Sequence, residues 1–193
     1  AGMRPGLALL AAGARATAAA TPLVGLHNGF WRLVGVLYVG LSCLAILWLR
    51  AEPAAGLATV LWLLALVWAT DIAAFAAGRR RGGPKLAPAI SPGKTWSGLA
   101  GGVAAAAAVG AAAAWLRPGT GPAVLAALSA GLAVVEQLGD LFESAVKRRF
   151  GVKDSSAIIP GHGGFLDRVD GLMAVSLTVA GLALVGGRSI LAW

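Results

Sequence analysis

The chain has 193 residues, of which 58% are hydrophobic and 12% are charged, and its mean hydropathy is +0.80. Soluble domains carry about 25% charged residues, so this composition excludes an ordinary soluble domain and predicts a polytopic membrane protein with a single domain. The net charge of +8 does not indicate nucleic acid, because the basic residues gather in short loops between apolar segments, as membrane topology and phosphate ligands favour.

Apolar segments of membrane-spanning length follow one another along the chain, since a helix needs about 20 apolar residues to cross a bilayer. In chain order they are 31–49, 55–77, 97–116, 121–139 (in a helix that continues to about residue 149) and 165–186. Residues 6–26 are weaker, because Arg15 and several threonines interrupt them, and 1–30 is treated as a poorly defined N-terminal segment. We expect an all-α bundle of about five to six transmembrane helices, forming one domain over 1–193.

One helix of this bundle is expected to pack closely against its neighbours. Gly98 and Gly102 are small residues four positions apart in the segment 97–116. Small residues at this spacing let helix backbones approach each other within a membrane. This pattern predicts packing and carries no chemistry.

Basic residues in the short loops predict the orientation of the chain. The loop at 78–96 carries Arg79, Arg80, Arg81, Lys85 and Lys94, and the loop at 147–164 carries Lys147, Arg148, Arg149 and Lys153. The alternate loops hold only Arg50 and Arg117. By the positive-inside rule both basic loops face the cytoplasm, and we expect a functional site at that interface.

Carboxylates are concentrated in or at the ends of the predicted spans. They are Asp71, Glu136, Asp140, Glu143, Asp167 and Asp170, six of the eight acidic residues in the chain. An intramembrane carboxylate is energetically costly and is a functional candidate by default. Asp71 is expected about six residues, or roughly 9 Å, from the cytoplasmic end of its helix. A polar contact between helices is the alternative for Asp71.

One face of the helix over 121–149 carries polar residues at positions i, i+4, i+8 and i+11, which are Glu136, Asp140, Ser144 and Lys147. Asp167 and Asp170 follow at the start of the next span. Mg²⁺ takes oxygen ligands and commonly binds one or two carboxylates together with substrate phosphate. A carboxylate from each of these two neighbouring helix ends, at the same depth, is therefore a candidate magnesium site. The alternative is that these acids only pair with adjacent lysines and arginines.

A glycine-rich turn precedes the last span. Its sequence over 160–164 is Pro-Gly-His-Gly-Gly, and Gly163 and Gly164 can expose backbone N–H groups beside a helix N-terminus, where anions are favoured. Such turns are common before helices, so the pattern is weak alone. His162 is a candidate for phosphate contact or proton transfer, with a hydrogen bond within the loop as the alternative.

The loop at 85–95 is a second candidate for phosphate contact. Its two prolines stiffen it, and Lys85, Ser91 and Lys94 suit phosphate or sugar contacts. A solvated positive-inside loop is the alternative, which explains the lysines but not the Ser-Pro-x-Lys-Thr order.

The stretch 144–170 resembles the signature of the phosphatidate cytidylyltransferases (CDP-diacylglycerol synthases). It satisfies Ser-x-apolar-Lys-Arg, four residues, Lys-Asp-x-small, two residues, apolar-Pro-x-His-Gly-Gly-apolar-x-Asp-Arg-apolar-Asp. Residues 139–144 and 71–98 are also similar to the family, and the resemblance covers about 31–190. The chain departs from the family at 72–75, where Ile-Ala-Ala-Phe replaces Thr-Gly-Ala-Tyr, and at Ser97, where a Glu is frequent. These departures put secondary contacts in doubt.

The resemblance implies a Mg²⁺-dependent transfer of a cytidylyl group from CTP to phosphatidate, giving CDP-diacylglycerol and pyrophosphate. Carried onto this chain, it implies a catalytic set of Asp140, Lys147, Asp167 and Arg168, and a metal set of Asp140 and Asp167. The implied substrate-binding set is Asp71, Lys85, Ser91, Lys94, Ser144, Arg148, Lys153, His162, Gly163 and Gly164. It also implies a multi-pass protein of the bacterial plasma membrane with its site facing the cytoplasm; a second metal ion and a homodimer stay open.

The beginning of the chain bears on its completeness. The chain starts at Ala1 rather than Met, and members of the family usually have more N-terminal membrane helices. We therefore expect either a fragment or a shortened form.

Three other classes remain open from the sequence. A CTP-dependent lipid kinase would share a cytoplasmic nucleotide site, but the complete signature argues against it. A transporter would use Asp71 and Asp140 as ion sites at the membrane midplane, but charges clustered at one interface argue against a permeation path. A non-catalytic membrane subunit is not excluded.

Overall fold

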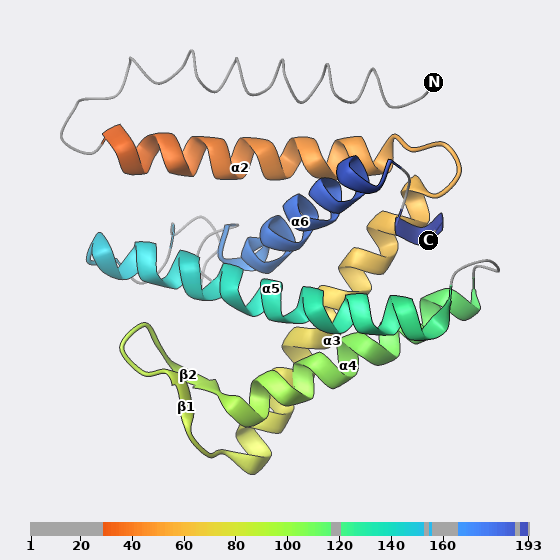
Figure 1. The fold of residues 1–193 in the computed structure, drawn as a ribbon. Coiled ribbons are helices and arrows are strands. Elements are labelled where there is room, and N and C mark those ends of the chain that lie inside the picture. The colour runs from red at the N-terminus through yellow and green to blue at the C-terminus, as the bar shows by residue number, and fades with distance from the viewer. Residues whose placement is uncertain (1–28, 117–120, 153–154, 156–165, 188–189, 193) are drawn as a thin grey trace.

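Five helices form the body of the protein in the computed structural model, which describes residues 29–116, 121–152, 155, 166–187 and 190–192 (Figure 1). The elements are α2 (Gly29–Arg50), α3 (Gly56–Arg81), β1 (Lys85–Ala87), β2 (Ser91–Thr95), α4 (Trp96–Trp115), α5 (Pro122–Arg149), η3 (Leu166–Arg168), α6 (Asp170–Gly186) and η4 (Ile190–Ala192). Four of them, α2 to α5, are long and apolar enough to cross a membrane. The prediction of a helical multi-pass membrane protein is confirmed, and the weak segment 6–26 lies outside the described residues.

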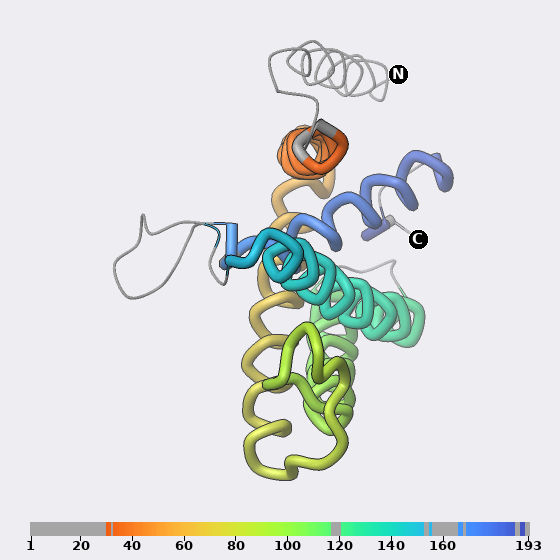
Figure 2. Tube along the Cα trace, turned by 90° about the vertical axis from the view of Figure 1, so that its left-hand side faces the viewer, coloured from red at the N-terminus to blue at the C-terminus, as the bar shows by residue number. Residues whose placement is uncertain are grey.

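The elements are spread between two edges of the molecule. The end of α3, the hairpin and the start of α4 lie at one edge of the molecule, and α2 lies at the opposite edge in both views (Figures 1 and 2). α5 and α6 pass between these edges. The core between the helices is apolar and includes the fully buried Leu66, Leu132, Val175 and Val179.

Helix α3 is longer than the sequence predicted, because its last turn is polar. It ends at Arg81 rather than at residue 77, and two glycines with positive φ, Gly82 (61°) and Gly83 (98°), then reverse the chain. The Gly82 N–H donates to the Gly78 carbonyl at 2.9 Å, which caps the last turn. Asp71 therefore lies ten residues, or about 15 Å, before the helix end, so the expected 9 Å was wrong.

A short β-hairpin joins α3 to α4, where the sequence predicted a loop. Strands β1 and β2 are antiparallel, with Lys85 opposite Thr95 and Ala87 opposite Ser91. The base of the hairpin is held by side chains. The Thr95 hydroxyl accepts the Gly98 N–H at 3.1 Å and caps α4, and the Ser97 hydroxyl donates to the Gly82 carbonyl. The fold is therefore helical apart from this two-stranded sheet, which the expectation of an all-α fold did not include.

Helix α4 presents a row of small residues to its neighbours. Every fourth residue is small and buried: Gly98, Gly102, Ala106, Gly110 and Ala114. A Cβ on Gly98 would lie 2.9 Å from the Ala74 carbonyl oxygen, and one on Gly102 would lie 2.9 Å from the Thr70 Cγ2 atom. These contacts confirm the predicted close packing, here against the backbone of α3.

The bounds of α5 agree with the prediction, whereas those of α6 differ from it. α5 begins with Pro122 in its first turn and ends at Arg149, as expected. α6 begins at Asp170, five residues later than the predicted start, because residues 166–168 form a separate 3₁₀ turn. With 17 residues α6 is about 26 Å long, slightly shorter than a hydrocarbon core of about 30 Å.

Candidate functional site

Lys94 of the hairpin forms an ion pair with Asp140 of α5. The Lys94 Nζ lies 2.6 Å from the Asp140 Oδ2, and the two side chains are 15% and 30% exposed. One turn further along α5, the Ser144 hydroxyl donates to the Asp140 Oδ1 at 3.3 Å. The structure thus brings together Lys94, Asp140 and Ser144, which the sequence proposed separately on a loop and on a helix face.

A second lysine joins the end of α5 to the turn before α6. The Lys147 Nζ donates to the Asp167 Oδ1 at 2.7 Å and to the Glu143 Oε2 at 3.2 Å. The Asp167 carboxylate also accepts the Ser155 backbone N–H, at 3.2 Å and 3.0 Å, and the Ser155 hydroxyl at 3.0 Å. This arrangement fixes the Asp167 side chain from two directions, from α5 and from the preceding loop residue.

Asp71 meets another carboxylate across a helix interface. Its side chain interacts with Glu136 of α5, and the charge of Lys94 acts on both carboxyl groups. Glu136 is 1% exposed and its Oε2 accepts the Gln137 side-chain amide at 2.7 Å. Asp71 therefore has a carboxyl neighbour on another helix, within reach of the charge of Lys94, and its role in substrate binding stays a prediction.

The remaining candidates are less constrained by contacts. Lys85 and Arg148 are exposed, at the start of β1 and at the end of α5, and Ser91 begins β2. Arg168 has its backbone in η3. The other predicted substrate-binding residues, Lys153, His162, Gly163 and Gly164, lie outside the described residues.

Two polar residues near these pairs were not assigned a role from sequence. Gln137 is 5% exposed and accepts a hydrogen bond from the Lys94 Nζ at 2.8 Å. Tyr38 of α2 donates a long hydrogen bond of 3.5 Å to the backbone carbonyl of Asp170. The position of Gln137, three residues before Asp140, was the available signal, since residues at i and i+3 share a helix face.

The carboxylates suit a hard cation only in part. Among the described residues, the structure holds no group of three or more His, Cys, Asp and Glu arranged to hold a metal. Asp140 and Asp167 each pair with a lysine, as the alternative reading expected. However, Glu143 is 7% exposed and its Oε1 is buried with no hydrogen-bond partner in the described structure. A buried carboxylate oxygen of this kind is a ligand that Mg²⁺ accepts, although the Lys147 ammonium group pairs with the other oxygen of Glu143 and with Asp167.

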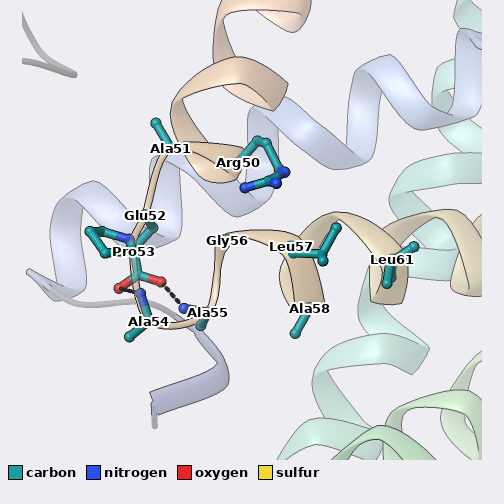
Figure 3. Close-up of a pocket in the computed structure, with 10 residues that line it drawn as sticks. All are labelled: Arg50, Ala51, Glu52, Pro53, Ala54, Ala55, Gly56, Leu57, Ala58 and Leu61. Carbon is teal, nitrogen blue, oxygen red and sulfur yellow. Dashed lines mark hydrogen bonds between the residues drawn. The ribbon is translucent and has the colours of Figure 1, made fainter.

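A cavity in the described part of the structure lies away from the paired lysines and carboxylates. It has a volume of about 540 Å³ and lies at the turn between α2 and α3, where Arg50, Glu52 and Leu57 are among the lining residues (Figure 3). The Glu52 carboxylate accepts the N–H groups of Ala54 and Ala55 within the same turn. The candidate site is instead an arrangement of charged side chains on the hairpin, on α5 and on the turn before α6.

Comparison with known proteins places this geometry in context. The profile of the cytidylyltransferase family matches residues 8–185. A phosphatidate cytidylyltransferase of Brucella suis is 51% identical over 146 residues, which cover 76% of this chain and 54% of that protein. Phosphatidate cytidylyltransferases of Pseudomonas aeruginosa (42% identical, 85% of this chain and 62% of that protein) and Staphylococcus aureus (41%, 74% and 54%) are also similar. The chain spans about half the length of the curated relatives it matches.

Proposed function

The chain belongs to the cytidylyltransferase family, and from this premise we propose that it transfers a cytidylyl group from CTP to phosphatidate. The relatives that share 41–51% of its residues are named for this reaction. The products are CDP-diacylglycerol and pyrophosphate. The polar end of the bundle faces the cytoplasm of a bacterium in this proposal, because CTP arrives from there while the acyl chains stay in the bilayer.

The observation that carries the proposal is the pairing of two lysines with two carboxylates across separate elements. Lys94 reaches Asp140 from the hairpin, and Lys147 reaches Asp167 from α5. Both pairs lie at one end of the bundle, where a lipid headgroup and a soluble nucleotide can meet. Ion pairs in a membrane protein are costly to bury, and their concentration at one interface supports a site for anionic substrates.

The reaction joins two anions. An oxygen of the phosphatidate phosphate attacks the α-phosphorus of CTP, and the bond from that phosphorus to the bridging oxygen breaks, so pyrophosphate leaves with the electron pair. The phosphate monoester is already largely ionised at pH 7, so no strong general base is needed. The protein must instead reduce the repulsion between the phosphates and align them. Lys94, Lys147 and Arg148 supply positive charge for this purpose.

Other residues of the site hold or orient these groups. In this proposal Ser144, Ser91 and Lys85 contact phosphate or sugar. Asp140 and Asp167 would hold Mg²⁺, and the buried oxygen of Glu143 belongs to the same helix as Asp140. The ion, when bound, supplies charge neutralisation at the phosphates. Arg168, Lys153, His162 and the N–H groups of Gly163 and Gly164 complete the phosphate contacts in this proposal.

The test is a direct assay of the reaction. Purified chain in mixed micelles is incubated with labelled CTP, phosphatidate and Mg²⁺, and lipid and soluble products are separated. We expect CDP-diacylglycerol and pyrophosphate in equal amounts, and no product when phosphatidate is omitted. A folded protein that releases CDP and phosphorylates a lipid alcohol would identify a kinase instead. No lipid product from a folded chain extended to the length of its relatives would leave a transporter or a non-catalytic subunit.

A further inference from the structure

A continuous set of polar contacts links three elements behind the Lys94–Asp140 pair. The Lys94 Nζ donates to the Gln137 Oε1 at 2.8 Å, and the Gln137 Nε2 donates to the Glu136 Oε2 at 2.7 Å. Glu136 in turn interacts with Asp71 of α3. The hairpin, α5 and α3 therefore meet through side chains, and the terminal group of this set is the lysine that faces Asp140.

The direction of these bonds is determined by the two groups that the Gln137 amide joins. The Glu136 Oε2 accepts the NH₂ end of the Gln137 amide. The oxygen end must then point toward Lys94, which has only donors. If the amide turned over, its NH₂ group would face the Lys94 ammonium group and its oxygen would face the Glu136 carboxylate. Glu136 thus fixes the orientation in which Gln137 can bind Lys94.

Both residues are held rigidly. Glu136 is 1% exposed and Gln137 is 5% exposed, so neither can exchange its partner for solvent. Glu136 also lies against the start of α6, where a Cβ on Gly171 would come within 2.8 Å of the Glu136 Cγ and Oε1 atoms. A buried polar group that loses its partner is costly, so this packing keeps the Gln137 amide in one orientation.

We propose that Gln137 is a positioning residue that holds the Lys94 ammonium group against Asp140, and that Glu136 sets the orientation of its amide. The inference rests on the proposed function, in which Lys94 meets the phosphates of the substrates. If Asp140 were its only partner, the Lys94 ammonium group could take more than one position, because it ends a long flexible side chain. The second contact, from Gln137 three residues earlier on the same helix face, restricts the ammonium group to one position.

The first test compares variants that keep or lose the oriented amide. Gln137→Leu removes the acceptor, and we expect kcat to fall about tenfold with the KM for CTP nearly unchanged, because Lys94 keeps its charge but not its orientation. Glu136→Ala should do the same. Glu136→Gln keeps a side-chain oxygen for the Gln137 amide and should retain activity within about twofold. Equal losses in Glu136→Gln and Glu136→Ala would overturn the proposal.

A matched control separates positioning from simple loss of stability. Ser129 lies on the same helix, is fully buried and accepts a hydrogen bond from the Trp62 Nε1 at 3.2 Å. Ser129→Ala also removes one buried hydrogen bond, so it should lower the midpoint of thermal unfolding, as Gln137→Leu does, while leaving kcat unchanged. A comparable fall of kcat in Ser129→Ala would mean that Gln137 acts only through stability.

The second test does not depend on turnover. Thermal unfolding in detergent is measured for Lys94→Met, Gln137→Leu and the double variant. Because the two side chains are in contact, the shifts in unfolding midpoint should not add. Additive shifts would overturn the contact whether or not the protein is active, whereas absence of CDP-diacylglycerol with the unchanged chain would count against the proposed function alone.

Discussion

The two ends of the helix bundle use charged residues differently. At the hairpin end, Lys94 forms an ion pair with Asp140 on another element. At the end formed by the turn between α2 and α3, the Glu52 carboxylate accepts N–H groups only two and three residues away, beside the cavity shown in Figure 3. The ion pair joins two elements that are far apart in the sequence, whereas the Glu52 hydrogen bonds stabilise a single turn.

The difference between these two carboxylates indicates which end of the bundle holds functional residues. A carboxylate that completes a turn has a sufficient structural reason to be there, since backbone N–H groups near a helix start need acceptors. A partly buried lysine–carboxylate pair lacks such a reason, because apolar residues of similar size are often as stable or more so. The largest effects of mutation on turnover are therefore expected at the hairpin end, and purely structural effects at the turn.

The largest expected effect comes from Asp167→Asn. The substitution keeps the size of the side chain and an oxygen that can accept the Ser155 backbone N–H, but it removes the negative charge that faces Lys147. We expect CTP-dependent formation of CDP-diacylglycerol to fall by about a hundredfold or more, the size of the loss when a charge-stabilising group is removed from an active site. Size-exclusion chromatography in detergent should show folded protein. Full activity in this variant would rule out a role for Asp167 in the reaction.

An intermediate effect is expected from Gly171→Ala, at the junction of α5 and α6. A Cβ at this position would lie 2.8 Å from the Glu136 Cγ, and Glu136 has no exposed space to move into. Overpacking of this kind costs about 1–3 kcal/mol, which thermal unfolding in detergent would detect. Gly181 on the same helix has no neighbouring atom within 4 Å. Gly181→Ala should be neutral or stabilising, and an equal loss in both variants would show that helix flexibility, not the close contact, matters.

The smallest effect is expected at the turn. Glu52→Ala removes two hydrogen bonds to the N–H groups of Ala54 and Ala55. Because the bond to Ala54 is exposed and can be replaced by water, we expect the free energy of unfolding to fall by about 0.5–1.5 kcal/mol, the net value of the one part-buried hydrogen bond, with turnover unchanged. Reduced turnover in a stably folded Glu52→Ala protein would show that the two ends are coupled, and would contradict the comparison drawn above.

The spans could be predicted from sequence because they depend on local composition. A run of apolar residues is sufficient to identify α2, α4 and α5, and regular spacing placed Asp140 and Ser144 on one face. The hairpin could not be predicted in the same way. Its strands contain Pro92 and Gly93, which are unfavourable in strands, and it is held by side-chain bonds at its base, such as that of Thr95 to the start of α4.

The partners within the site depended on packing between helices. Helical spacing could place Glu136 and Asp140 on one face, but not the partner of each. Glu136 lies against Asp71 and Gly171, whereas Asp140 meets Lys94. These choices follow from the small residues of α4, which bring α3 close, and from the hairpin, which directs Lys94 toward α5. Neither feature has a signal in the local sequence around α5, so the spacing of Gln137 from Asp140 could suggest a shared face but not its contact with Lys94.

The hydrogen bond from Lys94 to Gln137 has a consequence for how the protein is made. The two residues are 43 positions apart, and all of α4 and half of α5 lie between them. Closing so long a loop is entropically unfavourable until the intervening helices are in place. The contact therefore forms only after α4 and the first half of α5 have packed beside the hairpin, which makes it a late step in folding.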